Sequence, residues 1–379
     1  MMASCKTKDQ DLESKKFIRL FGTDADEKAW DIVQTEDNGF AILCQQSDSI
    51  GLKALLIRTD PSGKLLWQLG YRMDSTKDAV MHDLIKLDDG TLLMAGYTVN
   101  PKTGAKDGLM VNVRDEDSGS VVWFRPYGIP PSDKELNHVV QLKNGQLVAV
   151  GEIKGGIWLL RTNGQGEVIS EKSYKVGTGT KANSLVATND RLIACGNNQD
   201  SILLAAWKQE DDSLVWMKTL LAGSGAEGVG IAIPKDSSKI VVIGNIRGKS
   251  GNTDIFLGTY TTDGDSISSS IYSPSGEDLA MCRSIPSMAG DSFLVVGSTT
   301  SFGRDQKDIL VLKYNPSSQR KFEQENYGGR FDDVAISIIK LQDGTYAICG
   351  HTNSFAYNGK NDVFLMKLDG NGKLKLQEE

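Results

Sequence analysis

The chain has 379 residues and a formal net charge of −7, which argues against a nucleic-acid-binding protein, because such proteins usually carry a basic excess. No apolar run approaches the roughly 18 to 20 residues that a membrane helix needs, so no transmembrane helix is predicted. Forty glycines and few long helical periodicities favour one large all-β domain.

The first segment of the chain is polar and contains a cysteine after small residues, in Met2-Ala3-Ser4-Cys5. This pattern and the charged stretch up to Lys16 resemble the lipobox and spacer of a bacterial lipoprotein, which makes Cys5 a candidate lipidation site. The basic and apolar regions of a signal peptide do not stand before it in this sequence. Two interpretations remain open, a signal that was trimmed away or a chance cysteine. We expect residues 1–15 to form a flexible tether and residues 16–379 to form the folded domain.

The first complete structural unit follows this tether. It has an inner strand at Trp30–Thr35, a second strand that ends at Cys44, a third at Lys53–Thr59 and a fourth at Leu65–Tyr71. Asp-Asn-Gly and Asp-Pro-Ser-Gly sequences separate the strands, and such turn residues join antiparallel neighbours. The unit is therefore predicted to be a four-stranded antiparallel meander.

The second-strand motif of this unit recurs along the whole chain at intervals of 45 to 55 residues. Its seven copies end at Cys44, Gly96, Gly151, Gly196, Gly244, Gly297 and Gly350. A repeat of about this length, made of short apolar strands and Gly/Asp turns, is typical of propeller blades. The sequence therefore predicts an all-β fold, a seven-bladed β-propeller of four-stranded antiparallel blades. We expect Phe17–Phe21 to complete the last blade beside a short strand at Lys373–Leu376.

Four of the five cysteines lie in the predicted blades. Cys44, Cys195 and Cys349 occupy near-equivalent second-strand ends, and Cys282 is expected in an inner strand. Equivalent positions of a radial repeat point away from one another, so we predict no disulfides and expect buried free thiols.

The repeats resemble a loosely defined family of propeller lipoproteins and secreted propeller proteins of the Bacteroidota. Its pattern is matched in the seventh unit by Asp332, Gly344, Gly350, Thr352, Asp362, Lys367, Asp369 and Gly372. The second unit matches it with Asp78, Gly90, Gly96, Thr98, Asp107, Gly119 and Trp123. The resemblance implies an envelope location and a binding or scaffolding role, and it implies no catalytic residues. Carboxylates that recur before the inner strands, such as Asp26, Asp78 and Asp332, are expected to accept backbone N–H bonds.

Residues that break the repeat are the candidates for function. Aligning the units places Asp31, Asp83 and His138 at one level of the inner strands, which line the axial channel. Candidate ligand-binding residues are these three, their preceding neighbours Trp30, His82 and Asn137, and the charged exception Arg283. Carboxylate and imidazole together can hold a divalent cation or a polar ligand. The alternative is hydrogen bonding to channel water or to neighbouring backbone, and whether a metal binds is left open.

Long loops between second and third strands form a second candidate region, because recognition often lies on loops of a rigid scaffold. The candidate interaction residues in these loops are Lys102, Arg247, Phe302, Arg304, Phe355 and Tyr357. Solvated, non-interacting side chains are the alternative interpretation.

No Walker loop, nucleophile elbow, zinc-protease motif or cysteine pair is found, so no catalytic residue and no cofactor are predicted. We expect a non-enzymatic outer-membrane lipoprotein, periplasmic or surface-facing, that docks another envelope protein. The alternative is a glycan-binding protein or carbohydrate-active enzyme with its site at the channel mouth, since propeller enzymes assemble sites from scattered residues. The identity of the partner or substrate stays open.

Overall fold

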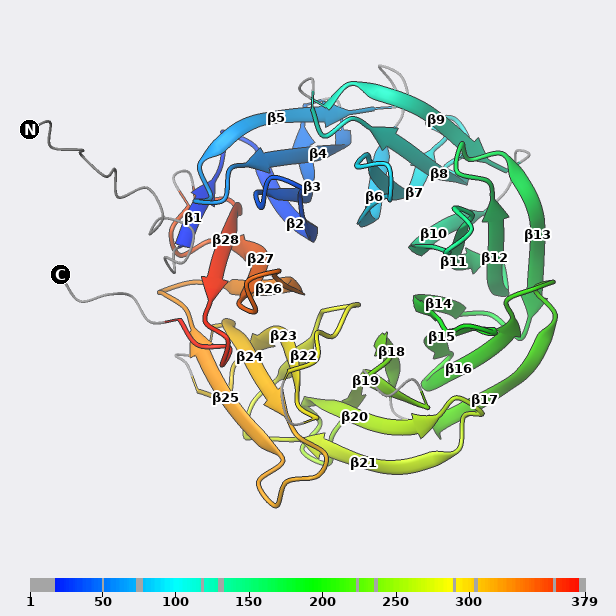
Figure 1. Ribbon diagram of the computed structural model, residues 1–379. Helices are drawn as coiled ribbons and strands as arrows, with labels where there is room; N and C mark the ends of the chain where they lie inside the picture. The colour runs from blue at the N-terminus through cyan, green and yellow to red at the C-terminus, as the bar shows by residue number, and fades with distance from the viewer. Residues whose placement is uncertain are drawn as a thin grey trace, which may run out of the picture.

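The computed structural model describes residues 18–49, 51–72, 78–116, 119–128, 133–222, 225–234, 238–288, 291–302, 306–356 and 359–374. In these residues, 28 strands form seven four-stranded antiparallel sheets arranged as blades around an axis (Figure 1). The predicted seven-bladed β-propeller is therefore confirmed. Nothing in the described part of the chain is a helix long and apolar enough to cross a membrane.

Each blade runs from an inner strand near the axis to an outer strand at the rim. The inner strands are β2 Asp26–Gln34, β6 Ala79–Lys86, β10 Lys134–Gln141, β14 Thr180–Ala187, β18 Glu227–Ala232, β22 Asp278–Ala280 and β26 Asp333–Lys340. The second strands are β3 Phe40–Asp48, β7 Leu92–Val99, β11 Leu147–Ile153, β15 Arg191–Asn198, β19 Lys239–Arg247, β23 Phe293–Thr299 and β27 Tyr346–Thr352.

The third strands are β4 Gly51–Thr59, β8 Lys106–Val113, β12 Gly156–Thr162, β16 Ser201–Lys208, β20 Thr253–Thr261, β24 Asp308–Tyr314 and β28 Asp362–Leu368. The outer strands are β5 Leu65–Tyr71, β9 Val121–Tyr127, β13 Val168–Lys175, β17 Leu214–Ala222, β21 Ser266–Tyr272, β25 Phe322–Tyr327 and β1 Ile18–Phe21. The last outer strand comes from the beginning of the chain.

The ring is closed by this N-terminal strand. β1 pairs with β28 in the seventh blade, from Ile18 opposite Met366 to Phe21 opposite Val363. Figure 1 shows the two strands side by side, one blue and one red. The expected closing strand is confirmed over Ile18–Phe21, whereas Phe17 lies outside the described residues. The predicted short C-terminal strand is not seen, because Lys373 and Leu374 belong to no strand and the following residues lie outside the described part.

The hydrophobic core lies between neighbouring blades. Second and third strands bury side chains on both faces, since each blade is covered by its two neighbours. The outer-strand residues Trp67, Trp123 and Trp216 are half-buried and pack on three different inter-blade clusters. The cysteines of the blades, Cys44, Cys195, Cys282 and Cys349, are buried free thiols, as expected.

Six inner strands share a β-bulge, an extra residue that redirects the following side chains. The register shifts between Ala29 and Asp31 in β2, and at the equivalent points of β6, β10, β14, β18 and β26. Trp30 is the extra residue of β2, and Asp31 follows it. The predicted alignment of Asp31, Asp83 and His138 at one level is therefore confirmed.

The sixth blade departs from this pattern. Its inner strand β22 ends at Ala280, so Cys282 and Arg283 lie beyond the strand, and their expected placement in an inner strand was wrong. Pro286 follows shortly after and has no N–H to donate to a strand neighbour. The segment after β22, which we call the crossing segment, instead runs into the centre of the ring and is drawn in yellow in Figure 1.

Candidate functional site

The axial channel contains a cavity of about 380 Å³. Its walls include four of the predicted site residues, Trp30, Asp31, Asp83 and Arg283. Further polar side chains lining it are Lys28, Lys181, Asn183, Glu227, Asn245, Ser284, Ser337 and His351. Because several of these stand at the beginnings of inner strands, the cavity lies toward the face that carries the loops between second and third strands, which we call the loop face. The opposite face, the turn face, carries the turns between first and second strands and between third and outer strands.

Asp31 is held by neighbours from three blades. Its Oδ1 accepts hydrogen bonds from Ile32 N at 2.8 Å and from Ser337 Oγ at 2.7 Å, and its Oδ2 accepts one from Leu84 N at 3.0 Å. Ser337 belongs to the seventh blade and Leu84 to the second. The carboxylate therefore joins adjacent blades as well as facing the cavity.

Asp83 repeats one of these contacts a blade further on. Its Oδ2 accepts a hydrogen bond from Val139 N at 2.7 Å, as Asp31 does from Leu84 N. Its Oδ1 lies 3.8 Å from His138 Nε2, too far for a hydrogen bond. His138 Nδ1 is buried without a partner among the described residues. His138 thus neighbours Asp83 and is not among the residues that line the cavity.

His82 and Asn137 are the extra residues of their bulges and connect blades. His82 Nδ1 lies 3.2 Å from Leu136 O and 3.1 Å from Asn137 Oδ1, so this nitrogen carries the proton that both acceptors share. Asn137 Nδ2 donates to Ala182 O at 2.9 Å. The two side chains occupy the hydrogen-bonding role that the alternative interpretation gave them, and neither lines the cavity.

Arg283 reaches across the channel from the sixth blade. Its Nη1 donates to the main-chain oxygen of His82, and its guanidinium lies over the Trp30 ring, 5.8 Å from the ring centre. Its own main-chain oxygen accepts a hydrogen bond of 3.0 Å from Ser184 Oγ. The segment after β22 therefore contacts three blades other than its own.

Burial sets the protonation of the acidic and imidazole groups. Burial, and then the nearby Asp83 carboxylate, raise the pKa of Asp31 to about 7, and burial raises the pKa of Asp83 to about 6. Burial, and then the Arg283 charge, lower the pKa of His82 and of His138 to about 4. At neutral pH both imidazoles are neutral, and the carboxylate pair titrates close to that pH.

The divalent-cation interpretation has no support from the geometry. Among the described residues, no group of three or more His, Cys, Asp or Glu side chains is arranged to hold a metal ion. His351, which the sequence analysis did not select, lines the cavity and has its pKa lowered to about 4 by burial. Its position directly after the Gly350 repeat motif is the signal that could have placed it at the channel mouth.

The predicted interaction loops carry exposed side chains. Phe302 is 45 % exposed and Phe355 is 57 % exposed, while Lys102 and Arg247 are also at the surface. Arg304 and Tyr357 lie outside the described residues, as does the candidate lipidation site Cys5. Phe331, which is 52 % exposed in the loop between the sixth and seventh blades, was missed because only loops inside blades were considered.

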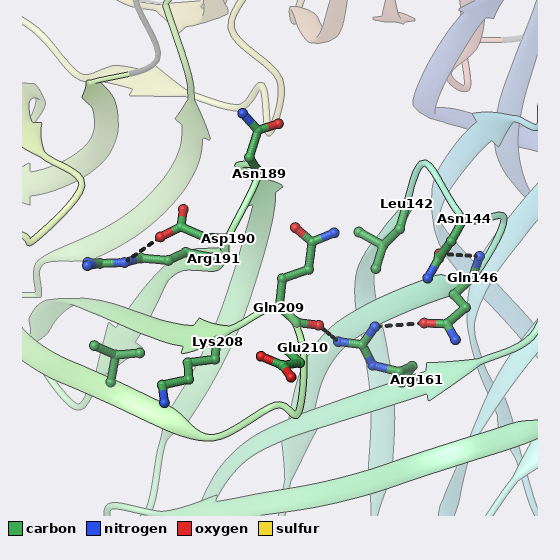
Figure 2. A pocket seen from close by; sticks show the side chains of 11 residues that line it. Leu142, Asn144, Gln146, Arg161, Asn189, Asp190, Arg191, Lys208, Gln209 and Glu210 are labelled. Carbon is green, nitrogen blue, oxygen red and sulfur yellow. Dashed lines mark hydrogen bonds and ion pairs between the residues drawn. The ribbon is translucent and has the colours of Figure 1, made fainter.

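A larger, open hollow of about 750 Å³ lies on the turn face between the third and fourth blades (Figure 2). Arg161 is one of the residues that line it, and it donates to Gln146 Oε1 at 2.9 Å and to Gln209 O at 2.7 Å. It also forms a buried ion pair with Asp212 of the fourth blade. Arg58 makes the equivalent pair with Asp115 of the second blade, and a further pair with Asp37 of its own blade. These arginines are fully engaged with the scaffold, so the hollow is not a candidate site.

Comparisons with known proteins agree on the fold. No model of a known protein family matches the chain, and no curated protein matches its sequence. The solved propeller of Dos1 is similar with a TM-score of 0.55 and 12% identity, over 92% of this chain and 80% of that chain. The WD40 domain of Toxoplasma gondii coronin gives 0.57 and 9%, over 96% and 89%.

A third similar structure is the hydrazine synthase of Kuenenia stuttgartiensis, with a TM-score of 0.53 and 10% identity, over 88% of this chain and 94% of that chain. Identities this low show a shared fold and nothing about activity. By fold, the chain is a seven-bladed β-propeller.

Proposed function

We propose that the protein is a non-enzymatic docking subunit that binds another protein through the loop face of its sixth and seventh blades. The observation that carries this proposal is the set of exposed aromatic rings there. Phe302, Phe331 and Phe355 are each about half exposed, although large apolar side chains are normally covered. Aromatic residues on loops of a rigid scaffold are typical of protein interfaces.

The loops that carry two of these rings are joined by hydrogen bonds. Ser354 Oγ accepts a hydrogen bond from Phe331 N at 2.9 Å and lies 3.0 Å from Phe331 O, which ties the inter-blade loop to the loop of Phe355. Phe355 also forms a wall of an apolar groove of about 320 Å³ beside the closing strand. The exposed Arg330 lies 6.0 Å from the ring centre of Phe331. A partner that inserts apolar side chains and carries carboxylates around them fits this surface.

The envelope location and the lipid anchor rest on the resemblance to Bacteroidota propeller lipoproteins. Ile18 stands thirteen positions after Cys5, and an extended chain of that length spans at most about 45 Å. Since Ile18 pairs with Met366, near the turn-face end of β28, the chain enters the ring at the turn face. An anchor at Cys5 therefore leaves the loop face free to meet a partner in an outer-membrane complex.

Docking is tested by co-purification from envelope membranes of the native organism. We expect a stoichiometric membrane protein to accompany the parent protein and to be lost from a Phe331→Ser, Phe355→Ser double variant. The matched control is Val122→Ser, Ile169→Ser, which removes two equally exposed apolar side chains from outer strands. Equal loss in both variants, or no stoichiometric partner of the parent, contradicts docking through this face.

Anchoring is tested separately by Cys5→Ala, with the protein expressed behind a lipoprotein signal sequence. We expect the parent to fractionate with membranes and the variant to be released, because a mature lipoprotein is held by several acyl chains. Membrane association that survives the substitution contradicts lipidation at Cys5.

A further inference from the structure

The axial cavity is a separate feature from the docking face, and its chemistry points to a small ligand. The crossing segment after β22 contributes Met281, Arg283 and Ser284 to its lining, and the other lining residues come from inner strands and their neighbours in several blades. A volume of about 380 Å³ is at the lower end of the roughly 300 to 1,000 Å³ that ligand pockets usually have.

Both cationic and acidic side chains line the cavity. Lys28, Lys181 and Arg283 supply three cations, and the facing carboxyl groups are those of Asp31, Asp83 and Glu227. One of these pairs is direct, since Lys181 Nζ lies 3.2 Å from Glu227 Oε1. A ligand with a large net charge would leave one half of this wall unmatched, whereas a neutral polar ligand can contact both halves.

Arg283 is the residue that leaves hydrogen-bonding capacity unused. A guanidinium has five N–H donors, and its only hydrogen-bond acceptor in the described part of the chain is His82 O. No ion pair within 4.0 Å joins Arg283 to either Asp31 or Asp83, although both carboxyl groups act on its charge through space. The guanidinium and the two carboxyl groups therefore face one cavity without touching.

A hydroxyl group matches this gap because it accepts one hydrogen bond and donates another. It can accept from the guanidinium of Arg283 and donate to a carboxylate, whereas a simple ion satisfies only one of the two sides. Further hydroxyl groups on the same small ligand would also reach Asn183, Lys28 and Lys181, which line the same cavity.

Trp30 adds an aromatic surface and a second unused donor. Its ring lines the cavity, and its Nε1 is buried without a hydrogen-bond partner in the described residues. A buried indole N–H normally finds an acceptor, and leaving such a donor unpaired destabilises the protein. A ligand oxygen beside the ring edge would supply that acceptor, with the C–H face of the ligand against the ring.

We propose that the axial cavity binds a neutral polyhydroxylated ligand, one or two sugar rings in size, between Arg283, Trp30 and the Asp31–Asp83 pair. The proposed site is separate from the docking face. It fits an uncharged sugar better than an acidic sugar, a phosphate or a polyamine.

Calorimetry at pH 7 with the full chain tests this proposal. The neutral probes are glucose, galactose, mannose, N-acetylglucosamine, maltose and cellobiose, and the charged probes are glucuronate, inorganic phosphate and putrescine. We expect at least one neutral sugar to bind with a Kd of about 1 mM or tighter, and the charged probes to bind at least about tenfold more weakly. Binding by charged probes only, or by none of the probes, overturns the proposal.

Two variants locate the site. Arg283→Met removes the guanidinium donors and is expected to weaken sugar binding roughly 10- to 100-fold, as expected for a charge-assisted hydrogen bond. Trp30→Phe keeps an aromatic ring, removes the N–H, and is expected to weaken binding about five- to tenfold. It also remains informative if Arg283→Met does not fold. The matched control is Arg125→Met, an exposed arginine of an outer strand. Sugar binding that is equal in Trp30→Phe, Arg125→Met and the parent overturns the assignment to this cavity.

Discussion

The first four blades and the sixth blade differ in how their inner strands contact the neighbouring blades. In the first four, a side chain of each bulged inner strand forms a hydrogen bond with the backbone of the next blade. Asp31 accepts from Leu84 N, and Asp83 accepts from Val139 N. Asn183 Nδ2 donates to Gly228 O at 2.8 Å in the same direction around the ring. In the sixth blade the inner strand ends at Ala280, and the chain leaves the repeat to cross the channel. The repeated hydrogen bonds between blades hold the ring together, whereas the crossing segment, which leaves the repeat, lines the cavity.

The two regions also differ in how polar groups are buried. Between the third and fourth blades, the Arg161–Asp212 pair is enclosed by further hydrogen bonds, including Tyr174 Oη to Asp212 O at 2.7 Å. At the axis, within the described part of the chain, the Arg283 side chain donates one hydrogen bond and Trp30 Nε1 donates none. A saturated polar group stabilises a scaffold, whereas an unsaturated one in a cavity can bind something.

The largest expected effect concerns the closing strand of the seventh blade. Deleting residues 1–24 removes β1, including the buried Phe21, which alone contributes about 1.5–3 kcal/mol. It also leaves β28 as an unpaired edge, which favours aggregation. We expect this truncation to lose cooperative unfolding, whereas deleting residues 1–14 leaves the melting temperature unchanged. Equal melting temperatures of the two truncations would refute the role of β1.

A smaller but clear loss is expected in the saturated scaffold. Asp212→Asn leaves the buried Arg161 charge without its counter-ion, and breaking such a pair costs about 3–5 kcal/mol. The control is Asp211→Asn, an exposed neighbour whose Oδ1 accepts a hydrogen bond from Ser213 N that asparagine can also accept. Urea unfolding of both variants measures the difference. A loss below 1 kcal/mol, taken as about the size of an ordinary hydrogen bond, would mean that the pair is not structural.

The repeat spacing made most of the ring predictable. Leu65–Tyr71 was predicted with the same bounds that β5 has, because a glycine turn and an alternating strand define it locally. Alignment of the units also predicted correctly that Asp31, Asp83 and His138 occupy equivalent positions in their inner strands. The crossing segment was not predictable in this way, because it has no counterpart in the other six blades and its main contact, Arg283 to His82, joins residues 201 positions apart.

The candidate site was predicted only in part, because alignment of the units gives a residue's position in its strand but not its contacts. Asp31, Asp83, Trp30 and Arg283 were selected and do share the cavity, whereas His82 and Asn137 turned out to point at the neighbouring blade. Whether the side chain of a bulge residue points into the cavity or toward the neighbouring blade depends on the local strand register, which cannot be read from the sequence. The pairing of Asp212 with Arg161 could not be predicted either, because the two residues lie in different blades.

At the axis, a substitution is expected to stabilise the protein. Because burial raises the pKa of Asp83 from 3.8 to about 6, the penalty of ionising it in the folded state is absent well below the unfolded value and complete above the raised pKa. Asp83→Asn keeps the acceptor for Val139 N and removes that penalty. We expect the variant to gain about 1–3 kcal/mol over the parent at about pH 7.5 and nothing at about pH 3. Urea unfolding at the two pH values, with the exposed Asp89→Asn as control, checks this, and a pH-independent difference contradicts it.

The smallest effect is expected where the fifth blade holds the short strand β22. Asn245 Oδ1 accepts from Ala280 N at 2.9 Å, and its Nδ2 donates to Ala280 O at 3.0 Å. Asn245→Ala leaves both backbone groups unpaired and is expected to cost about 1–2 kcal/mol and to speed hydrogen exchange at Ala280. Asn371→Ala, in an exposed turn, is the control. Unchanged exchange at Ala280 would show that other contacts hold β22.

The closing strand also decides how a mechanical load enters the molecule. Any pull on the residues before Ile18 reaches the ring through four residues of β1, which are held mainly by their pairing with β28. The other six outer strands are covalently continuous with their own third strands, so they share no such joint. A tethered propeller under tension therefore opens first at the seventh blade. That blade also carries Phe355, so tension on the tether and the integrity of the proposed docking face are mechanically linked.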